Sequence, residues 1–168
     1  MINSSEYSPF YQNYIDLASS YDLLDGLDST LDNTLKLYES IPTSKASYAY
    51  DSGKWTVKQL IAHVIDTERI FQYRALRIAR EKGSCSGFNE DLFADNNTAV
   101  HRSISDLADE FHAVRLSTIA LFDSFTLQEL MQLGFADQKP LSARACGFII
   151  VGHALHHNQI LEKRYLNH

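Results

Sequence analysis

The 168-residue sequence is poor in the residues that interrupt helices or cross-link small domains. It has three prolines and seven glycines, which leaves long segments free of helix breakers. Its two cysteines, Cys85 and Cys146, lie far apart and form no C-x-x-C pair. This usage favours a reduced, cytoplasmic protein over one held together by disulfides.

Positive charge and long apolar runs are also scarce. Lys and Arg total 15 against 21 Asp and Glu, for a formal net charge of −6. Tight non-specific binding to nucleic acid needs clustered positive charge, so we do not expect it. The sequence has no apolar run long enough for a membrane span, and its N-terminus has neither the basic start nor the apolar core of a secretory signal. The length suits a single domain over residues 1–168.

Four long segments carry apolar residues at helical spacing. The second begins with Thr56 and Gln59 at the spacing of a capping box. The third has apolar residues at alternating intervals of three and four, which is a heptad seam. Together they predict an all-α protein, a four-helix bundle. The expected helices cover about residues 22–38, 56–80, 103–125 and 142–165.

The connecting segments show weaker patterns. Residues 1–20 contain several aromatic side chains without sustained periodicity, and we expect an N-terminal arm packed across the bundle. Residues 84–102 are predicted to form a long loop, which is often functional but can equally serve as a crossover between helices. No pair of strands is convincing.

Histidines on the fourth segment, GHALHHNQIL, are the first candidates for chemistry. His153 and His157 are four residues apart, so on a helix they lie about 40° apart on one face and can share one ion. They also occupy the apolar stripe between Ile149 and Ile160, where buried imidazoles need partners. The alternative is a histidine pair bonded to backbone, tyrosine or water at a half-exposed edge.

A third ligand would have to come from another helix. His63 lies in the second segment, within LIAHVIDTE, and on its own would be an ordinary packed histidine. Asp66, one turn further on, either accepts a hydrogen bond from an imidazole or is an exposed acid beside Arg69. His156 points away from the stripe, so we expect it to be exposed or to support the site from outside. Two further histidines are expected to face solvent, His101 and His112.

The chain resembles the DinB-like superfamily of bacterial metal-binding four-helix bundles, which includes proteins described as candidate metal-dependent hydrolases. The resemblance spans nearly the whole sequence. It is carried by residues 9–14 of the arm, KWTVKQLIAHVIDTERIFQYRALRIAR, GFNEDLF and GHALHHNQILEKRYL. The family pattern has one histidine on the second helix and two on the fourth, which match His63, His153 and His157.

This resemblance implies an up-down-down-up topology with a long crossover between the second and third helices, and a homodimer. The family name does not imply DNA binding. Relatives with known roles use low-molecular-weight thiols together with a bound metal, as transferases or isomerases. Others have no demonstrated activity, so the resemblance does not fix a reaction.

Three protein ligands leave at least one coordination position open, as in catalytic metal sites. We therefore expect a metal-dependent enzyme that acts on a small molecule, with zinc or nickel bound; hydrolysis and thiol transfer both remain open. Asp66 and Glu68 are candidates for handling protons, and Arg74 for binding an anionic part of the substrate. The alternatives are a non-catalytic stress-response protein that binds metal or a ligand, and a bundle whose pocket is vestigial.

Overall fold

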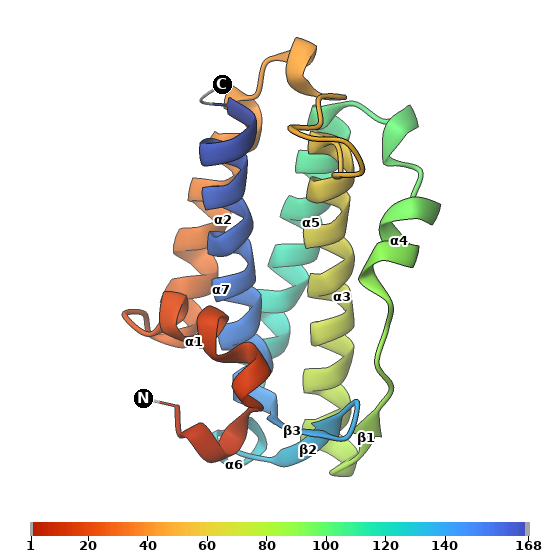
Figure 1. The fold of residues 1–168 in the computed structure, drawn as a ribbon. Helices are drawn as coiled ribbons and strands as arrows, with labels where there is room; N and C mark the ends of the chain where they lie inside the picture. Colours follow the sequence, from red (N-terminus) through yellow and green to blue (C-terminus); the bar gives the residue numbers. More distant parts are fainter. Residues whose placement is uncertain (1, 167–168) are drawn as a thin grey trace.

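The computed structural model describes residues 2–166, and four long helices packed side by side dominate them (Figure 1). The expected domain, residues 1–168, extends beyond this range by residues 1 and 167–168. In Figure 1, α2 and α7 ascend while α3 and α5 descend, and α3 and α2 each pack against both α5 and α7. The fold is therefore the expected all-α bundle with up-down-down-up topology. The long helices are α2 (Leu23–Ser40), α3 (Val57–Glu81), α5 (Ile104–Asp123) and α7 (Ala143–Ile160).

The predicted capping box fixes the start of α3. The Thr56 hydroxyl accepts a hydrogen bond from the Gln59 amide at 3.2 Å, and the Gln59 side chain accepts from the Thr56 amide at 3.0 Å. Two otherwise unpaired N–H groups of the first turn are satisfied in this way. The cap sets the register of α3, and with it the position of His63 two turns further on.

The crossover from α3 to α5 is more ordered than the predicted loop. It contains β1 (Ser84–Cys85), α4 (Glu90–Asn96) and the short 3-10 helix η4 (Ala99–His101). The Asn89 side chain caps α4 by accepting from the Leu92 amide at 3.0 Å, and two acidic residues in the first turn suit the positive end of the helix. α4 runs beside α3 (Figure 1), so the crossover forms one wall of the bundle.

A small sheet corrects the expectation that the chain has no strand pair. β2 (Leu133–Ala136) and β3 (Lys139–Ser142) form an antiparallel hairpin, and β1 pairs with β2 in parallel. The two turn residues, Asp137 and Gln138, have φ angles of 50° and 60°. Positive φ at both central positions is typical of a two-residue hairpin turn, but Asp-Gln lacks the glycine that usually signals one. The hairpin follows the short helix α6 (Leu127–Leu130).

The N-terminal arm is largely helical. It forms η1 (Ser4–Glu6), η2 (Pro9–Tyr11) and α1 (Gln12–Ala18), and α1 packs against α7. A Cβ atom at Gly152 would overlap the backbone carbonyl oxygen of Tyr14. Glycine at this position therefore lets the arm lie directly on α7, beside His153.

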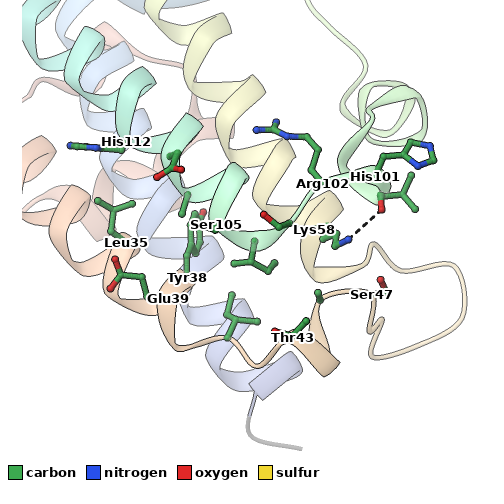
Figure 2. A pocket seen from close by; sticks show the side chains of 17 residues that line it. Leu35, Tyr38, Glu39, Thr43, Ser47, Lys58, His101, Arg102, Ser105 and His112 are labelled. Carbon is green, nitrogen blue, oxygen red and sulfur yellow. Dashed lines mark hydrogen bonds between the residues drawn. The ribbon is translucent and has the colours of Figure 1, made fainter.

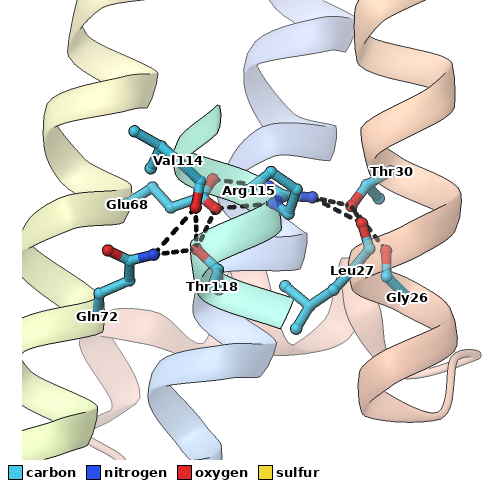
Figure 3. A network of polar contacts seen from close by, with 8 residues as sticks. All are labelled: Gly26, Leu27, Thr30, Glu68, Gln72, Val114, Arg115 and Thr118. Carbon is cyan, nitrogen blue, oxygen red and sulfur yellow. Dashed lines mark hydrogen bonds and ion pairs between the residues drawn. The ribbon is translucent and has the colours of Figure 1, made fainter. Parts of the chain in front are cut away.

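The bundle interior contains a polar network among α2, α3 and α5 (Figure 3). The Arg115 guanidinium donates to both carboxylate oxygens of Glu68, each at 2.8 Å, and to the Thr30 hydroxyl at 2.5 Å. The Thr118 hydroxyl donates to Glu68 as well, at 2.6 Å. Buried charges require such compensation, which this network supplies within the protein.

The C-terminal end of α7 continues as a π-helix, Leu161–Leu166. Each turn of a π-helix contains more residues than a turn of an α-helix. The inward side chains here are therefore Leu161 and Tyr165, four residues apart, while Arg164 is exposed. None of the helices within residues 2–166 combines the length and the apolar character that a bilayer span requires.

Candidate metal centre

Three histidine side chains from two neighbouring helices meet inside the bundle. His63 comes from α3, and His153 and His157 come from α7, which packs against α3. The Nε2 atom of His153 lies 3.0 Å from that of His63 and 3.1 Å from that of His157. The three rings offer ligand atoms that all lie within 4.8 Å of one another, and the side chains are buried. Across residues 2–166, this is the one group of three such side chains with metal-site spacing.

The chemistry of this donor set suits a divalent metal ion. A ring nitrogen carries either a proton or a lone pair, so His153 Nε2 cannot donate to one neighbour and accept from the other. One ion accepts lone pairs from all three rings at once. Tetrahedral zinc with Zn–N bonds of 2.0–2.1 Å places its nitrogen ligands about 3.4 Å apart, close to the spacing seen here. A coordination site therefore explains the contacts among the three rings better than hydrogen bonding does.

Burial keeps these imidazoles neutral. It lowers the pKa of His63 to about 4. Burial also lowers the pKa values of His153 and His157 well below the ordinary range, and the neighbouring imidazoles lower them further. Since a metal binds the neutral ring, the site is in its ligating form near neutral pH.

Aromatic side chains cover the histidine cluster. The Trp55 ring lies over His63, with ring centroids 4.6 Å apart, and the Tyr14 ring meets His153 edge-on at 5.4 Å. His156 is half-buried and packs between Tyr14 and His157, at 5.5 and 5.0 Å. It therefore contacts the cluster from outside rather than joining its three ligand atoms.

Two cavities border the cluster. The first, of about 350 Å³, is lined by His153 together with Tyr14, Thr67 and Arg74, and we call it the arm cavity. The second, of about 250 Å³, is lined by His157, Trp55 and Asp91 among others, and we call it the tryptophan cavity. The cluster thus has space beside it at His153, in the arm cavity, and at His157, in the tryptophan cavity.

A larger cavity, about 980 Å³, lies elsewhere, between α2 and the start of α5 (Figure 2). The exposed His101 and His112 line it, and Lys58 donates to the Val100 carbonyl at its edge, at 3.2 Å. The three-histidine cluster does not line this cavity. Size alone therefore does not identify the site.

The predicted acidic groups do not reach the imidazoles. Glu68 directs its carboxylate to Arg115 and Thr118. Asp66 lies 3.9 Å from Arg69 and lines a separate cavity of about 280 Å³. Burial raises the pKa of Asp66 and the charge of Arg69 opposes that rise. Within residues 2–166, no hydrogen bond joins either carboxylate to His63, His153 or His157.

Two acidic residues of α4 line the cavities beside the histidine cluster. Asp91 lines the tryptophan cavity, and its charge partly offsets the effect of burial on the pKa of His63. Glu90 lines the arm cavity and adds to the effect of burial in raising the pKa of Tyr14. In the sequence, only the acidic FNEDLF segment could have indicated that Glu90 and Asp91 belong to the site. Its position beside α3 depends on the path of the crossover, which the sequence does not specify.

Comparisons with known proteins agree with this architecture. Residues 27–161 match the family model of the DinB superfamily. Among solved structures, the chain is similar to YfiT from Bacillus subtilis, described as a probable metal-dependent hydrolase with an unusual four-helix bundle topology. The TM-score is 0.71 at 15% sequence identity, over 97% of this chain and 87% of that one. At this identity the likeness shows the fold alone, and no curated protein matches. Because the family match covers most of its length, the chain belongs to the DinB superfamily.

Proposed function

We propose that this protein is a metal-dependent enzyme acting on a small molecule, with His63, His153 and His157 as the metal ligands. The observation that carries the proposal is the convergence of three neutral, buried imidazoles at a point flanked by two cavities. Three protein ligands leave a coordination position open to water or substrate, whereas structural zinc sites are usually closed by four.

The reaction we propose is hydrolysis or transfer to a low-molecular-weight thiol. A divalent ion held by the three imidazoles, zinc or nickel, would supply Lewis-acid chemistry to the attacking water or thiol. Asp91 is our candidate for taking the proton that this nucleophile loses, because it lines the cavity that contains His157. Trp55 and Tyr14 cover the rings and limit the access of bulk water.

Hydrolysis is supported by the likeness to YfiT, whose description is that of a probable metal-dependent hydrolase. The thiol alternative rests on the family resemblance. We further propose a homodimer in the cytoplasm, on the same resemblance and on the two scattered, buried free cysteines. Size-exclusion chromatography with light scattering tests the dimer.

Metal content and turnover test the proposal together. The purified protein should contain about one divalent ion per chain, and the zinc-loaded form should hydrolyse esters or transfer thiols in a substrate panel. His153→Ala should lose both properties. His112→Ala is the matched control because His112 is exposed on α5, outside both cavities. A protein that binds metal tightly but turns over no substrate would instead be a non-catalytic metal- or ligand-binding protein.

A further inference from the structure

Arg74 is a buried cation without an acidic partner. Its side chain is 3% exposed, and no carboxylate lies within ion-pair distance of it anywhere in residues 2–166. Its Nη2 donates to the Ser86 carbonyl at 3.1 Å, and its guanidinium lies over the rings of Phe71 and Phe88. It also interacts with the Tyr11 hydroxyl, where its charge opposes the rise in pKa that burial causes. Its Nε is buried and has no hydrogen-bond acceptor in the described part of the chain. A buried charge in this condition is unfavourable unless a further group compensates it.

Arg115 is also deeply buried, but its charge is compensated within the protein. Arg115 has a bidentate carboxylate partner in Glu68 and a further acceptor in Thr30 (Figure 3). Its charge is neutralised within the fold, so it has no need of a ligand. Arg74 lacks an equivalent carboxylate, although it is nearly as buried.

Arg74 lines the arm cavity, which also contains His153. Thr67, Phe71 and Arg74 follow one another at i, i+4 and i+7 on α3 and therefore form one stripe along the cavity wall. The Thr67 hydroxyl is buried and also has no hydrogen-bond partner within residues 2–166. Two incompletely satisfied polar groups thus share one cavity with a proposed metal ligand, as expected where a polar ligand binds.

The remaining walls define the kind of ligand. Tyr11, Phe71 and Phe88 supply aromatic surface. The acidic residues Glu90 and Asp137 line the cavity too, but both are exposed. Lys139 lines the cavity as well and pairs with Asp137 at 3.4 Å. Because solvent screens exposed charges more than buried ones, the buried guanidinium has the strongest influence on which charge the cavity favours.

We propose that the arm cavity binds a small organic anion whose carboxylate or phosphate is received by Arg74. The apolar part of this anion would lie on the aromatic walls, and the reacting end of the anion would face His153. This assignment of a substrate class rests on the proposed function for the position of the reacting end. The anion site itself depends only on Arg74 and the cavity, so the two can fail separately.

Phenylacetate, phenyl phosphate and the neutral phenylacetamide are suitable probes because they share a ring and differ in the charged group. Binding is measured by calorimetry and by the NMR signal of the Arg74 Nε–H on full-length, metal-free protein. The metal-free form is decisive because zinc would itself attract a carboxylate. Arg74→Gln and Arg74→Lys are compared with Arg77→Gln. Arg77 is a partly exposed arginine one turn along the same helix, and it pairs with Glu81.

We expect at least one of the two anions to bind about tenfold or more tightly than the amide and to shift the Arg74 Nε–H signal. Arg74→Gln should remove that preference, Arg74→Lys should keep part of it, and Arg77→Gln should leave it intact. Whichever anion binds identifies the group as carboxylate or phosphate. Equal binding of anions and amide, no binding of any probe, or equal loss in the Arg74 and Arg77 variants would overturn the proposal. The wild-type NMR signal keeps the test valid even if Arg74→Gln fails to fold.

Discussion

Arg115 and Glu68 form a bidentate ion pair in which the two side chains are 0% and 2% exposed. Both carboxylate oxygens of Glu68 accept from the guanidinium, and one also accepts from Thr118. The pair joins α3 to α5, and the Arg115 contact to the Leu27 carbonyl at 3.0 Å extends it to α2. Glu68 therefore contributes to packing among three helices, and its carboxylate is not free to serve the imidazole cluster.

Removing one partner of this pair should strongly destabilise the fold. Arg115→Met leaves the Glu68 carboxylate buried without a cation, and Glu68→Gln leaves the Arg115 guanidinium buried without a carboxylate. Each should lower the free energy of unfolding by about 3–5 kcal/mol, measured by urea denaturation monitored by circular dichroism. The double variant Glu68→Gln with Arg115→Met should lose less than the sum of these two single variants, since neither charge is then left without its partner.

Arg77→Gln is the surface control for this series and should change stability by less than about 0.5 kcal/mol. Single-variant losses no larger than that control would mean that the pair contributes nothing. Metal binding by Glu68→Gln, measured at a temperature where it is folded, should match wild type because Glu68 does not contact the histidines.

Arg74→Met should behave differently from Arg115→Met. The substitution removes a buried charge without leaving a carboxylate unpaired, and methionine retains much of the apolar contact with Phe71 and Phe88. We expect the free energy of unfolding to stay within about 1 kcal/mol of wild type, as is common when a binding residue is replaced. A loss comparable to that of Arg115→Met would show that Arg74 has a structural role instead.

Metal should stabilise the folded chain. An ion that binds only the folded state adds about 2.7 kcal/mol of stability when its free concentration is 100 times its dissociation constant. Thermal unfolding with zinc and with excess chelator measures the difference. Trp55 is the single tryptophan and lies over His63, so its fluorescence offers a second readout at the site. His153→Ala should show no stabilisation by zinc, whereas His112→Ala should respond like wild type.

The parts of the fold that follow local rules could be predicted from the sequence. The spacing of apolar residues predicted the four long helices, and Thr56 with Gln59 marked the start of α3. Because His153 and His157 share a helix, their proximity follows from helical geometry alone. The proximity of His63 to this pair depends on the packing of α3 against α7, and only the family resemblance predicted it.

What could not be predicted depends on contacts between distant segments. Glu68 and Arg115 are 47 residues apart, and nothing local distinguishes Arg115 from a solvated charge beside the helix seam. Asp91 reaches the tryptophan cavity only because the crossover folds back along α3. The hairpin turn at Asp137 and Gln138 lacks glycine, so its strands carried no turn signal.

Gly152→Ala should disturb the site through the arm. The added methyl group would overlap the Tyr14 carbonyl oxygen, which belongs to the backbone and cannot rotate away. Either α1 moves off α7 or α7 shifts, and both move Tyr14 relative to His153. We expect about 2–4 kcal/mol of lost stability and weaker zinc binding. Ala154→Gly, two residues along α7, is the control for the effect of an alanine–glycine exchange on helix propensity. Unchanged stability and zinc affinity in Gly152→Ala would contradict this account.

The anchoring of the arm should depend on pH through Glu6. Its carboxylate accepts from Arg144 Nε and Nη2 at 2.6 and 2.5 Å, and from the Ser142 hydroxyl at 2.9 Å. Burial alone would raise the pKa of Glu6, but these bonds and one from the Asn3 amide hold it below its ordinary value of 4.5. A carboxyl group with a lowered folded-state pKa stabilises the fold above its unfolded-state pKa, and this contribution is lost as the pH falls through the folded-state value.

Glu6→Gln should therefore lower the free energy of unfolding by about 1–2 kcal/mol near pH 7, as expected for a partly screened, charge-assisted bond. The difference from wild type should shrink as the pH falls below about 4.5, where the wild-type carboxyl group itself takes up a proton. Urea denaturation of both proteins across that range measures it. Glu39→Gln, on the exposed face of α2, should differ from wild type by less than about 0.5 kcal/mol throughout. A Glu6→Gln effect that stays constant as the pH falls would mean that packing, rather than the charge on Glu6, anchors the arm.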